Sequence, residues 1–348
     1  MTTTQMAREI AEQPEAVART LDALLPLVPE LAALARPRRR VLLAGRGTSD
    51  NAAVYGRYVC EALAGVPAAL AAPSVATHYG ARLDLSDTLV VSLSQSGSTG
   101  EIVETQRWAR DCGAATLAVT NTAGSPLTEE ADLAFVTEAG PERAVPATKT
   151  FTTALVAVGL LLPALTGREP EGLRALPDAV AEAVGRGGAA ERAASVLAAR
   201  RGGTVVTGRG LTFPVALETG LKLEETCLRP VRGLSYADLQ HGPRAVLDGT
   251  TAVVVVAPTE GPVLPDLTAF TASLPATGAA VVGLGGDEAL GAHCDPWVRG
   301  PVLGEALSAV TTAVLGQLVA ERLAAELGLD PDAPRGLRKV TQTEARTA

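Results

Sequence analysis

The stretch Leu89–Arg110, which reads LVVSLSQSGSTGEIVETQRWAR, decides the fold of this chain. It begins with a short apolar run, Leu89–Leu93, of the kind that forms a buried strand. A turn of hydroxyl residues follows, and then an amphipathic segment, Glu101–Arg110. This order predicts a strand, a tight turn and a helix, which is the repeating element of α/β proteins with parallel sheets.

The turn Ser94–Thr99 contains four hydroxyl side chains and one glycine. It immediately precedes a predicted helix N-terminus, where backbone N–H groups lack partners and the helix dipole is positive. Such a turn can bind a phosphate without a lysine. A turn that only caps the helix is the alternative, because Ser and Thr are common caps. Since four hydroxyls exceed what one cap requires, the turn is a candidate phosphate-binding loop.

Composition limits the class of protein. A length of 348 residues indicates about two domains of roughly 150 residues each. With 47% hydrophobic and 20% charged residues the chain can build a large core, and at 3% aromatic residues that core must consist mainly of Ala, Val and Leu. The net charge of −8 argues against a nucleic-acid partner.

Cysteine usage and hydropathy bear on the cofactor and the compartment. The four cysteines, Cys60, Cys112, Cys227 and Cys294, are scattered and form no CxxC pair, so a zinc site or a disulfide framework has no support. The N-terminus lacks the apolar region of a secretory signal. The longest apolar stretch, near Thr153–Leu165, is short for a membrane span and contains Pro163. We therefore expect a cytoplasmic protein with no metal, no other cofactor and no membrane partner.

The sequence repeats itself. Val41–Ser49 reads VLLAGRGTS and Thr204–Thr212 reads TVVTGRGLT, so that Gly45 and Gly208 lie 163 positions apart (208 minus 45). Nearly the same offset relates two further pairs of apolar runs: Leu89–Leu93 with Ala252–Val256, and Thr116–Thr120 with Ala280–Leu284. Three matches in one order indicate two copies of one α/β unit.

The fold class predicted from this repeat is α/β, with two tandem domains that each hold a parallel sheet between layers of helices. Ligands of such folds bind beyond the carboxyl ends of the strands, where both the Gly-Arg-Gly turn and the serine-rich turn fall. We expect an N-terminal helical segment at 1–35, a first domain at 36–166, a helical connector at 167–199, a second domain at 200–327 and an extended tail at 328–348.

The second copy contains candidate catalytic groups on one predicted helix, Ala216–Thr226. Glu218, Lys222 and Glu225 are spaced i, i+4 and i+7, so they share a helix face. We expect the same helix to bury apolar residues that include Leu217 and Leu221. A surface ladder of ion pairs is the alternative interpretation of this spacing, and the sequence pattern leaves both open.

A histidine in a predicted loop favours the catalytic interpretation. His241 lies in the segment Leu239–Val246 beside a Gly-Pro pair, where an imidazole is available for proton transfer near neutral pH. The other two histidines, His78 and His293, lack a comparable setting, and we interpret them as structural or surface residues.

Taken together, these motifs resemble the sugar isomerase (SIS) superfamily. The similarity is to its double-SIS branch, which includes the isomerase half of glucosamine-6-phosphate synthase and stand-alone deaminase-like proteins. The motifs are GRGTS at Gly45–Ser49, SQSGST at Ser94–Thr99, ATKTFTT at Ala147–Thr153, LETGLKLEE at Leu217–Glu225, HGP at His241–Pro243 and PRGLRK at Pro334–Lys339. They cover nearly the whole chain in one order.

The resemblance implies a role for each matching residue. Glu225 would move a proton between C1 and C2 of an open-chain sugar, and His241 would open the sugar ring from the neighbouring subunit of a homodimer with shared active sites. Lys222 would lie near O1 and C2, Lys339 would engage the sugar carbonyl, and Glu218 would be a further acid of the site. The sugar 6-phosphate would be bound by Ser49, Ser94, Gln95, Ser96 and Thr99, and the sugar pocket would be lined by Gly47, Thr48, Val145 and Ala147.

Departures from the family pattern bear on the substrate. Ala147 replaces a serine, Pro146 replaces another small residue, and Ser98 replaces an acid. No glutamine-hydrolysing segment precedes the match, so we expect the reverse of synthesis: glucosamine 6-phosphate would give fructose 6-phosphate and ammonia. The alternatives are a lyase acting on N-acetylglucosamine 6-phosphate, a deglycase acting on fructosamine 6-phosphates and a non-catalytic sensor of sugar phosphates.

Overall fold

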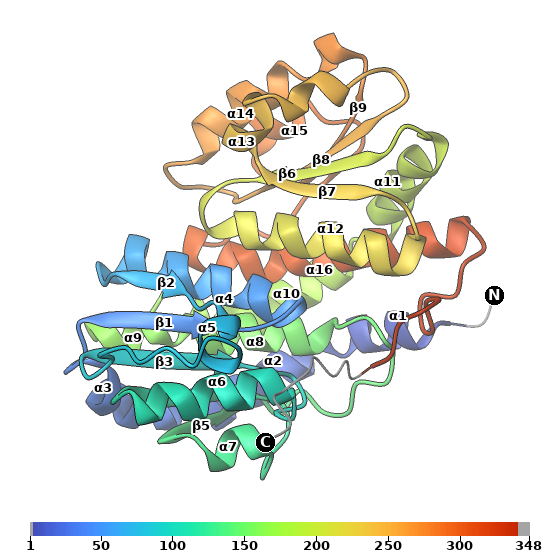
Figure 1. Cartoon of the computed structure of the whole chain (residues 1–348). Coiled ribbons are helices and arrows are strands. Elements are labelled where there is room, and N and C mark those ends of the chain that lie inside the picture. Colours follow the sequence, from blue (N-terminus) through green and yellow to red (C-terminus); the bar gives the residue numbers. More distant parts are fainter. Residues whose placement is uncertain (1–2, 340–348) are drawn as a thin grey trace. The chain divides into compact units, whose positions relative to one another are not determined.

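Two parallel sheets of five strands organise the chain in the computed structural model, which describes residues 3–339 (Figure 1). The chain divides into two compact units, one around each sheet. The first-sheet unit comprises Glu15–Glu142 and Lys149–Pro170. The second-sheet unit comprises residues 3–14 together with Arg143–Thr148 and Glu171–Lys339.

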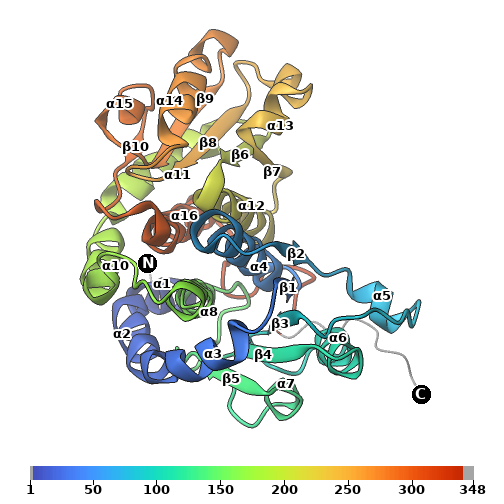
Figure 2. The same ribbon diagram turned by 90° about the vertical axis from the view of Figure 1, so that its left-hand side faces the viewer.

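The first sheet has the strand order β2-β1-β3-β4-β5. Its strands are β1 (Arg40–Ala44), β2 (Ala68–Leu70), β3 (Thr88–Leu93), β4 (Ala115–Thr120) and β5 (Leu133–Val136). The helices in this part of the chain are α2 (Gln13–Leu24), α3 (Val28–Ala35), α4 (Thr48–Tyr58), α5 (Pro73–Thr77), α6 (Gly100–Asp111), α7 (Pro126–Glu129), α8 (Lys149–Gly159) and α9 (Leu161–Thr166). Figure 2 shows α6 and α7 on one side of this sheet and α3 and α8 on the other.

The second sheet has the order β10-β9-β8-β6-β7. Its strands are β6 (Thr204–Gly208), β7 (Val231–Ser235), β8 (Ala252–Ala257), β9 (Ala280–Gly285) and β10 (Trp297–Val298). The helices of its unit are α1 (Gln5–Ala11), α10 (Leu176–Val184), α11 (Gly187–Ala199), α12 (Phe213–Cys227), α13 (Tyr236–Gln240), α14 (Leu264–Ala272), α15 (Glu288–Gly291) and α16 (Glu305–Glu326). In Figure 1, α13, α14 and α15 cover one face, and α12 and α16 cover the other.

The short 3-10 helices are η1 (Leu25–Leu27), η3 (Leu173–Ala175), η4 (Gly210–Thr212), η5 (Pro243–Val246) and η6 (Pro275–Thr277). The segment η2 (Val59–Ala64), directly after α4, is a π-helix. From 329 to 339 the described tail contains no helix, as its prolines predicted. The segment 167–199 contains α10 and α11, and its role as a connector between two domains stays a prediction.

The two sheets have matching topologies, which confirms the predicted internal repeat. Read in reverse, the second order is β7-β6-β8-β9-β10, and each strand then corresponds to the strand at the same place in the first sheet. β1 corresponds to β6, β3 to β8 and β4 to β9, which are the three pairs of apolar runs recognised in the sequence. The predicted α/β class with two parallel sheets flanked by helices is therefore correct.

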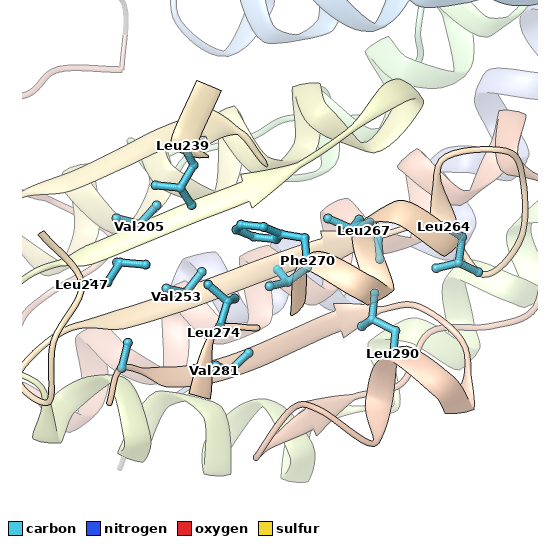
Figure 3. Packing of buried hydrophobic residues seen from close by; sticks show 13 residues of the cluster. Val205, Leu239, Leu247, Val253, Leu264, Leu267, Phe270, Leu274, Val281 and Leu290 are labelled. Atoms are coloured by element: carbon cyan, nitrogen blue, oxygen red, sulfur yellow. The ribbon is translucent and has the colours of Figure 1, made fainter. Parts of the chain in front are cut away.

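The core follows from the burial of the central strands on both faces. Every residue of β3, β4, β8 and β9 is buried, as expected for parallel strands covered by helices on both sides. Figure 3 shows one layer of this core, where Val253 and Val281 of the second sheet meet Leu267 and Phe270 of α14. Phe270 is the one aromatic residue among the buried members of this cluster, so Val, Leu and Ala fill it, as the composition predicted.

One helical stretch of the described residues, Lys149–Thr166, is long and apolar enough to cross a membrane by length and composition alone. It is 72% buried inside the protein. A buried core helix of a globular protein passes the same test, so this finding is weak evidence of a membrane span. The stretch also comprises two helices, α8 and α9, rather than one uninterrupted helix.

Candidate active site

The serine-rich loop Ser94–Thr99 connects β3 to α6 in the first-sheet unit, as the sequence predicted. Gly97 has a φ of +63°, and a methyl group at its Cα would lie 2.0 Å from the Oγ of Ser125, so only glycine fits there. The Gly97 carbonyl accepts the N–H of Leu127 at 2.9 Å. The Gln95 carbonyl accepts the N–H of Asn121 at 3.0 Å. These contacts hold the loop backbone in one conformation.

The hydroxyl groups of this loop pair with one another instead of capping the helix. The Ser94 and Thr99 hydroxyls are 3.1 Å apart, and the Ser98 hydroxyl donates to the Ser96 hydroxyl at 3.0 Å. Thr99 is the N-cap residue of α6, yet its side chain makes no capping hydrogen bond. Because the hydroxyls are not used for capping, the simple capping interpretation does not explain why four of them are present.

The turn Gly45–Ser49 lies next to this loop. β1 and β3 are adjacent parallel strands in which Ala44 pairs with Ser92, so their carboxyl ends meet at one edge of the sheet. Gly47, with a φ of +54°, is the N-cap residue of α4, so Thr48 and Ser49 lie in the first helical turn. The edge therefore gathers two helix N-termini and the predicted phosphate-binding residues from both turns.

An ion pair that the sequence analysis missed joins the two turns. Arg46 donates to Glu101 through two nitrogens, Nε to Oε2 at 2.8 Å and Nη2 to Oε1 at 2.7 Å. Glu101 is buried in the first turn of α6. Its hydrogen bond raises the pKa of Arg46 above the usual value. The sequence indicates only that Arg46 lies between two glycines in a candidate ligand-binding turn. It does not indicate the partner, because Glu101 is 55 residues away in sequence.

Helix α12 of the second-sheet unit carries the three charged residues on one face. The Lys222 ammonium lies 2.5 Å from Oε2 of Glu225 and 3.4 Å from Oε1 of Glu218. The side chains of Lys222 and Glu218 are 1% and 2% exposed, whereas that of Glu225 is 21% exposed. The buried lysine thus bridges one buried carboxylate and one that water can reach.

This burial corrects two sequence-based statements. The alternative of a surface ion-pair ladder is wrong, because Glu218 and Lys222 are buried. The expected burial of Leu217 and Leu221 is only partial, and both remain half-buried. Helix α16 packs closely against α12, since a methyl group on Gly316 would lie 2.3 Å from Oγ1 of Thr219. The buried face of α12 therefore contains Glu218, Thr219 and Lys222 beside the apolar Leu223.

The charge state of Lys222 follows from two opposing effects. Burial alone would lower the pKa of its ammonium group. The nearby carboxylates of Glu218 and Glu225 outweigh that effect, so its pKa lies above the usual value. Lys222 is therefore a cation at neutral pH and can stabilise negative charge, but it cannot act as a base.

Three other predicted residues lie elsewhere in the second-sheet unit. His241 follows α13 in an exposed turn, where Gly242 adopts a φ of +116°. Val145 and Ala147 lie in the segment Arg143–Thr148 and are half-buried. The predicted residues thus fall into groups by unit: the serine-rich loop and the Gly45–Ser49 turn in the first, and α12, His241 and the 143–148 segment in the second.

Lys339 closes the described chain, 13 residues after the end of α16 (339 minus 326). It is half-buried and belongs to the second-sheet unit. Among residues 3–339 the structure contains no group of three or more His, Cys, Asp or Glu side chains that could hold a metal ion.

Comparison with solved structures places this geometry in a family. A crystal structure of a proposed phosphosugar isomerase from Silicibacter pomeroyi DSS-3 is 34% identical in sequence, with a TM-score of 0.81. The match covers 94% of this chain and 100% of the other. The SIS domain profile also matches residues 34–164. The chain belongs to the SIS family of phosphosugar isomerases.

Other SIS proteins match over nearly the whole chain. The C-terminal domain of glucosamine-fructose-6-phosphate aminotransferase from Francisella tularensis is 26% identical, with a TM-score of 0.85 and coverage of 95% of this chain and 98% of that one. The glutamine–fructose-6-phosphate aminotransferase (isomerizing) of Symbiobacterium thermophilum is 36% identical over 97% of this chain. This chain spans 59% of the length of that relative. The resemblance identified in the sequence is thereby confirmed.

Proposed function

We propose that this SIS protein acts on an amino-sugar 6-phosphate and converts glucosamine 6-phosphate and water into fructose 6-phosphate and ammonia. The observation that carries the proposal is the buried ammonium of Lys222 between Glu218 and Glu225. Burying a charge is costly, and a buried ion pair adds little net stability, so such a group in a family of enzymes is a candidate catalytic group.

The chemistry begins with the open-chain form of the sugar. Glu225 is the base in this proposal because its carboxylate is partly exposed, while that of Glu218 is buried. Glu225 takes the proton from C2, and the electron pair of that bond moves toward the C1 carbonyl. The cationic Lys222 stabilises the negative charge that develops on O1.

Return of the same proton to C1, with transfer of one proton from the amine nitrogen to O1, completes the isomerisation. The nitrogen on C2 is then an imine, and water adds to its carbon to release ammonia and leave the C2 ketone of fructose 6-phosphate. Every atom is accounted for by one sugar phosphate and one water. Lys339, which the family resemblance assigns to the sugar carbonyl, would hold that end of the substrate.

The two turns at the edge of the first sheet would hold the phosphate. Ser49, Ser94, Gln95, Ser96 and Thr99 offer hydroxyl, amide and backbone donors near two helix N-termini. A bound phosphate would restrict the positions that C1 and C2 of the same sugar can take.

The names of the relatives support the substrate class. The name glutamine–fructose-6-phosphate aminotransferase (isomerizing) describes an amination coupled to isomerisation of fructose 6-phosphate. The proposed deamination runs in the opposite direction, from the amino sugar to fructose 6-phosphate, and it releases the nitrogen as free ammonia. It therefore needs the same binding of a hexose 6-phosphate and the same proton transfer between neighbouring carbons.

The deciding experiment is a parallel incubation with glucosamine 6-phosphate and N-acetylglucosamine 6-phosphate. Products are identified by mass spectrometry, and ammonia is assayed separately. Ammonia and a hexose phosphate from the free amine are the expected result. If folded wild-type protein forms neither ammonia nor a hexose phosphate from an amino-sugar phosphate, the proposal is overturned. A non-catalytic sensor of sugar phosphates would then be the remaining interpretation.

A lyase acting on the acetylated sugar is the second candidate. Ala147, half-buried in the 143–148 segment, replaces a serine of the family pattern, and the smaller side chain leaves room for an acetyl group. Glu225 would again remove the C2 proton, and the C3 hydroxyl would leave with a proton as water, forming a C2–C3 double bond. A product lighter by one water, formed without ammonia, would identify this reaction.

A shared active site in a homodimer is part of the proposal. The His241 imidazole is exposed and makes no hydrogen bond or ion pair within residues 3–339, which supports a role toward a second copy. Mixing the impaired variants His241→Ala and Glu225→Gln after subunit exchange should restore part of the activity toward ring-closed sugars, because one site of each mixed dimer would then have both groups. Absence of any recovery in verified mixed dimers would refute sharing.

A further inference from the structure

The tail that carries Lys339 is attached to helix α1 by a single carboxylate. Asp332 accepts the backbone N–H of Gln5 through Oδ2 and that of Met6 through Oδ1, both at 2.7 Å. These two amides open α1, so they would otherwise lack acceptors. Figure 1 shows the tail after α16 returning beside α1. A turn between Pro334 and Leu337, closed by a hydrogen bond of 3.2 Å, leads from this anchor toward Lys339.

The pocket segment Arg143–Thr148 is attached to the same helix and to the same tail residue. Glu9 of α1 is fully buried, and its carboxylate accepts the backbone N–H of Arg143 at 2.5 Å and that of Ala144 at 3.3 Å. The backbone carbonyl of Asp332 accepts the N–H of Val145 at 3.0 Å. Asp332 therefore joins the tail, α1 and the pocket segment.

Helix α16 fixes this assembly from the other side. Thr4, the N-cap residue of α1, donates its hydroxyl to Glu321 at 2.8 Å. Gln317 accepts the side-chain amide of Gln13 at 2.8 Å and donates to the carbonyl of Thr148 at 3.1 Å. The pocket segment is consequently held at both ends by polar contacts to α1, α16 and the tail.

From these contacts we propose that Glu9 and Asp332 are positioning residues, which set Lys339 and the Val145–Ala147 pocket wall in a fixed relation through α1. The inference rests on the proposed function, since that function assigns both elements to the sugar. The carboxylates of Glu9 and Asp332 accept backbone amides, so in this proposal their effect acts through the elements that they hold. A displacement of about 1 Å at a reacting group can reduce turnover by about two orders of magnitude.

The test removes each contact with a small change. Asp332→Asn and Glu9→Gln remove the charge and keep a similar shape. Gln5→Pro deletes the N–H that Asp332 accepts and also the hydrogen bond of 2.9 Å that the Gln5 side-chain amide donates to Glu9. Proline is tolerated at the first position of a helix. Asp22→Asn is the matched control, because Asp22 is exposed on α2 and has no hydrogen bond or ion pair among the described residues.

Two readouts separate positioning from folding. We expect kcat to fall by about tenfold or more in the three variants, while KM and the inhibition constant of inorganic phosphate change by less than about twofold, since the proposed phosphate residues lie in the first-sheet unit. Trypsin cleavage after Arg335, followed by mass spectrometry, should be faster in these variants than in the wild type and in the control, because the tail is released.

The outcomes are distinct. Faster cleavage of the tail with unchanged kcat would overturn the proposal, and so would a fall in kcat that is matched by loss of folded protein in a thermal melt. Unchanged cleavage in all three variants would overturn it as well. If the folded wild type converts no sugar phosphate and does not bind inorganic phosphate, the proposed function fails instead.

Discussion

The substitution Lys222→Met removes the charge from the centre of α12 and leaves a side chain of similar length. Glu218, 2% exposed and 3.4 Å from the lysine nitrogen, then becomes a buried carboxylate without its cation. Coulomb's law with an effective dielectric constant of about 20 gives about 5 kcal/mol for that separation. Loss of one partner of a buried pair costs about 3–5 kcal/mol. We expect a loss of unfolding free energy of about that size at pH 8.

The loss should depend on pH with a definite sign. In the folded variant we expect buried Glu218 to keep its proton. In the unfolded chain the same side chain has the ordinary glutamate pKa of about 4.3 and is ionised above that pH. The folded state then binds more protons than the unfolded state, so stability falls as pH rises, by about 1.4 kcal/mol per pH unit for one proton. Between pH 5.5 and pH 8 the variant should lose about 3 kcal/mol relative to the wild type.

The assay is urea unfolding followed by tryptophan fluorescence. The chain contains two tryptophans, and Trp108→Phe leaves Trp297 on β10 as the reporter of the second-sheet unit. Leu221→Met is the control for introducing methionine on the same helix. Removing both partners with Glu218→Gln and Lys222→Met together should recover part of the stability, because no buried charge is then left unpaired.

A Lys222→Met protein within about 1 kcal/mol of the wild type at pH 8 would refute the reasoning. So would a variant that becomes more stable as pH rises, because that sign requires Glu218 to remain ionised in the folded state. Additive effects in the double variant would show that the two side chains do not interact across the 3.4 Å that separates them.

Three further predictions concern the candidate site. Glu225→Gln should abolish turnover and retain substrate binding that calorimetry can measure. The control Glu224→Gln, the same change at an exposed neighbour, should leave turnover within about twofold of the wild type. An active Glu225→Gln protein would exclude Glu225 as the base. Arg46→Ala should raise the inhibition constant of inorganic phosphate by about tenfold. Adding Glu101→Gln should raise that constant little further, because the two side chains form one ion pair. A second increase of about tenfold in the double variant would disprove this coupling. His241→Ala should slow the reaction of ring-closed sugars more than that of open-chain analogues, measured by kcat/KM, and equal losses would remove its ring-opening role.

The sequence by itself determined the fold class and the location of the candidate loops. Apolar runs such as Leu89–Leu93 become central strands because only a segment buried on both faces can be apolar throughout. The offset of 163 positions between Gly45 and Gly208 (208 minus 45) revealed the repeat, which the matching strand orders confirm. These features are local or periodic, so they are visible without knowledge of which segments come together.

The sequence also placed three charged residues on one face of α12, because helical periodicity fixes which side chains share a face. It did not determine whether that face lies in solvent or in the interior. In the structure Glu218 and Lys222 are buried, and α16 packs closely against the same helix at Gly316 and Thr219, whereas Leu217 is half-buried. Burial depends on the neighbouring helix, which is far away in sequence.

Only the tertiary structure decided the polar contacts between distant segments. Arg46 and Glu101 are 55 residues apart, and Gln5 and Asp332 are 327 residues apart, yet each pair is within hydrogen-bond distance. A hydrogen bond requires two groups to meet within about 3 Å, and no sequence period encodes such a meeting between remote elements. The packing of the sheets and helices brings these groups together, and with them the support of the candidate site.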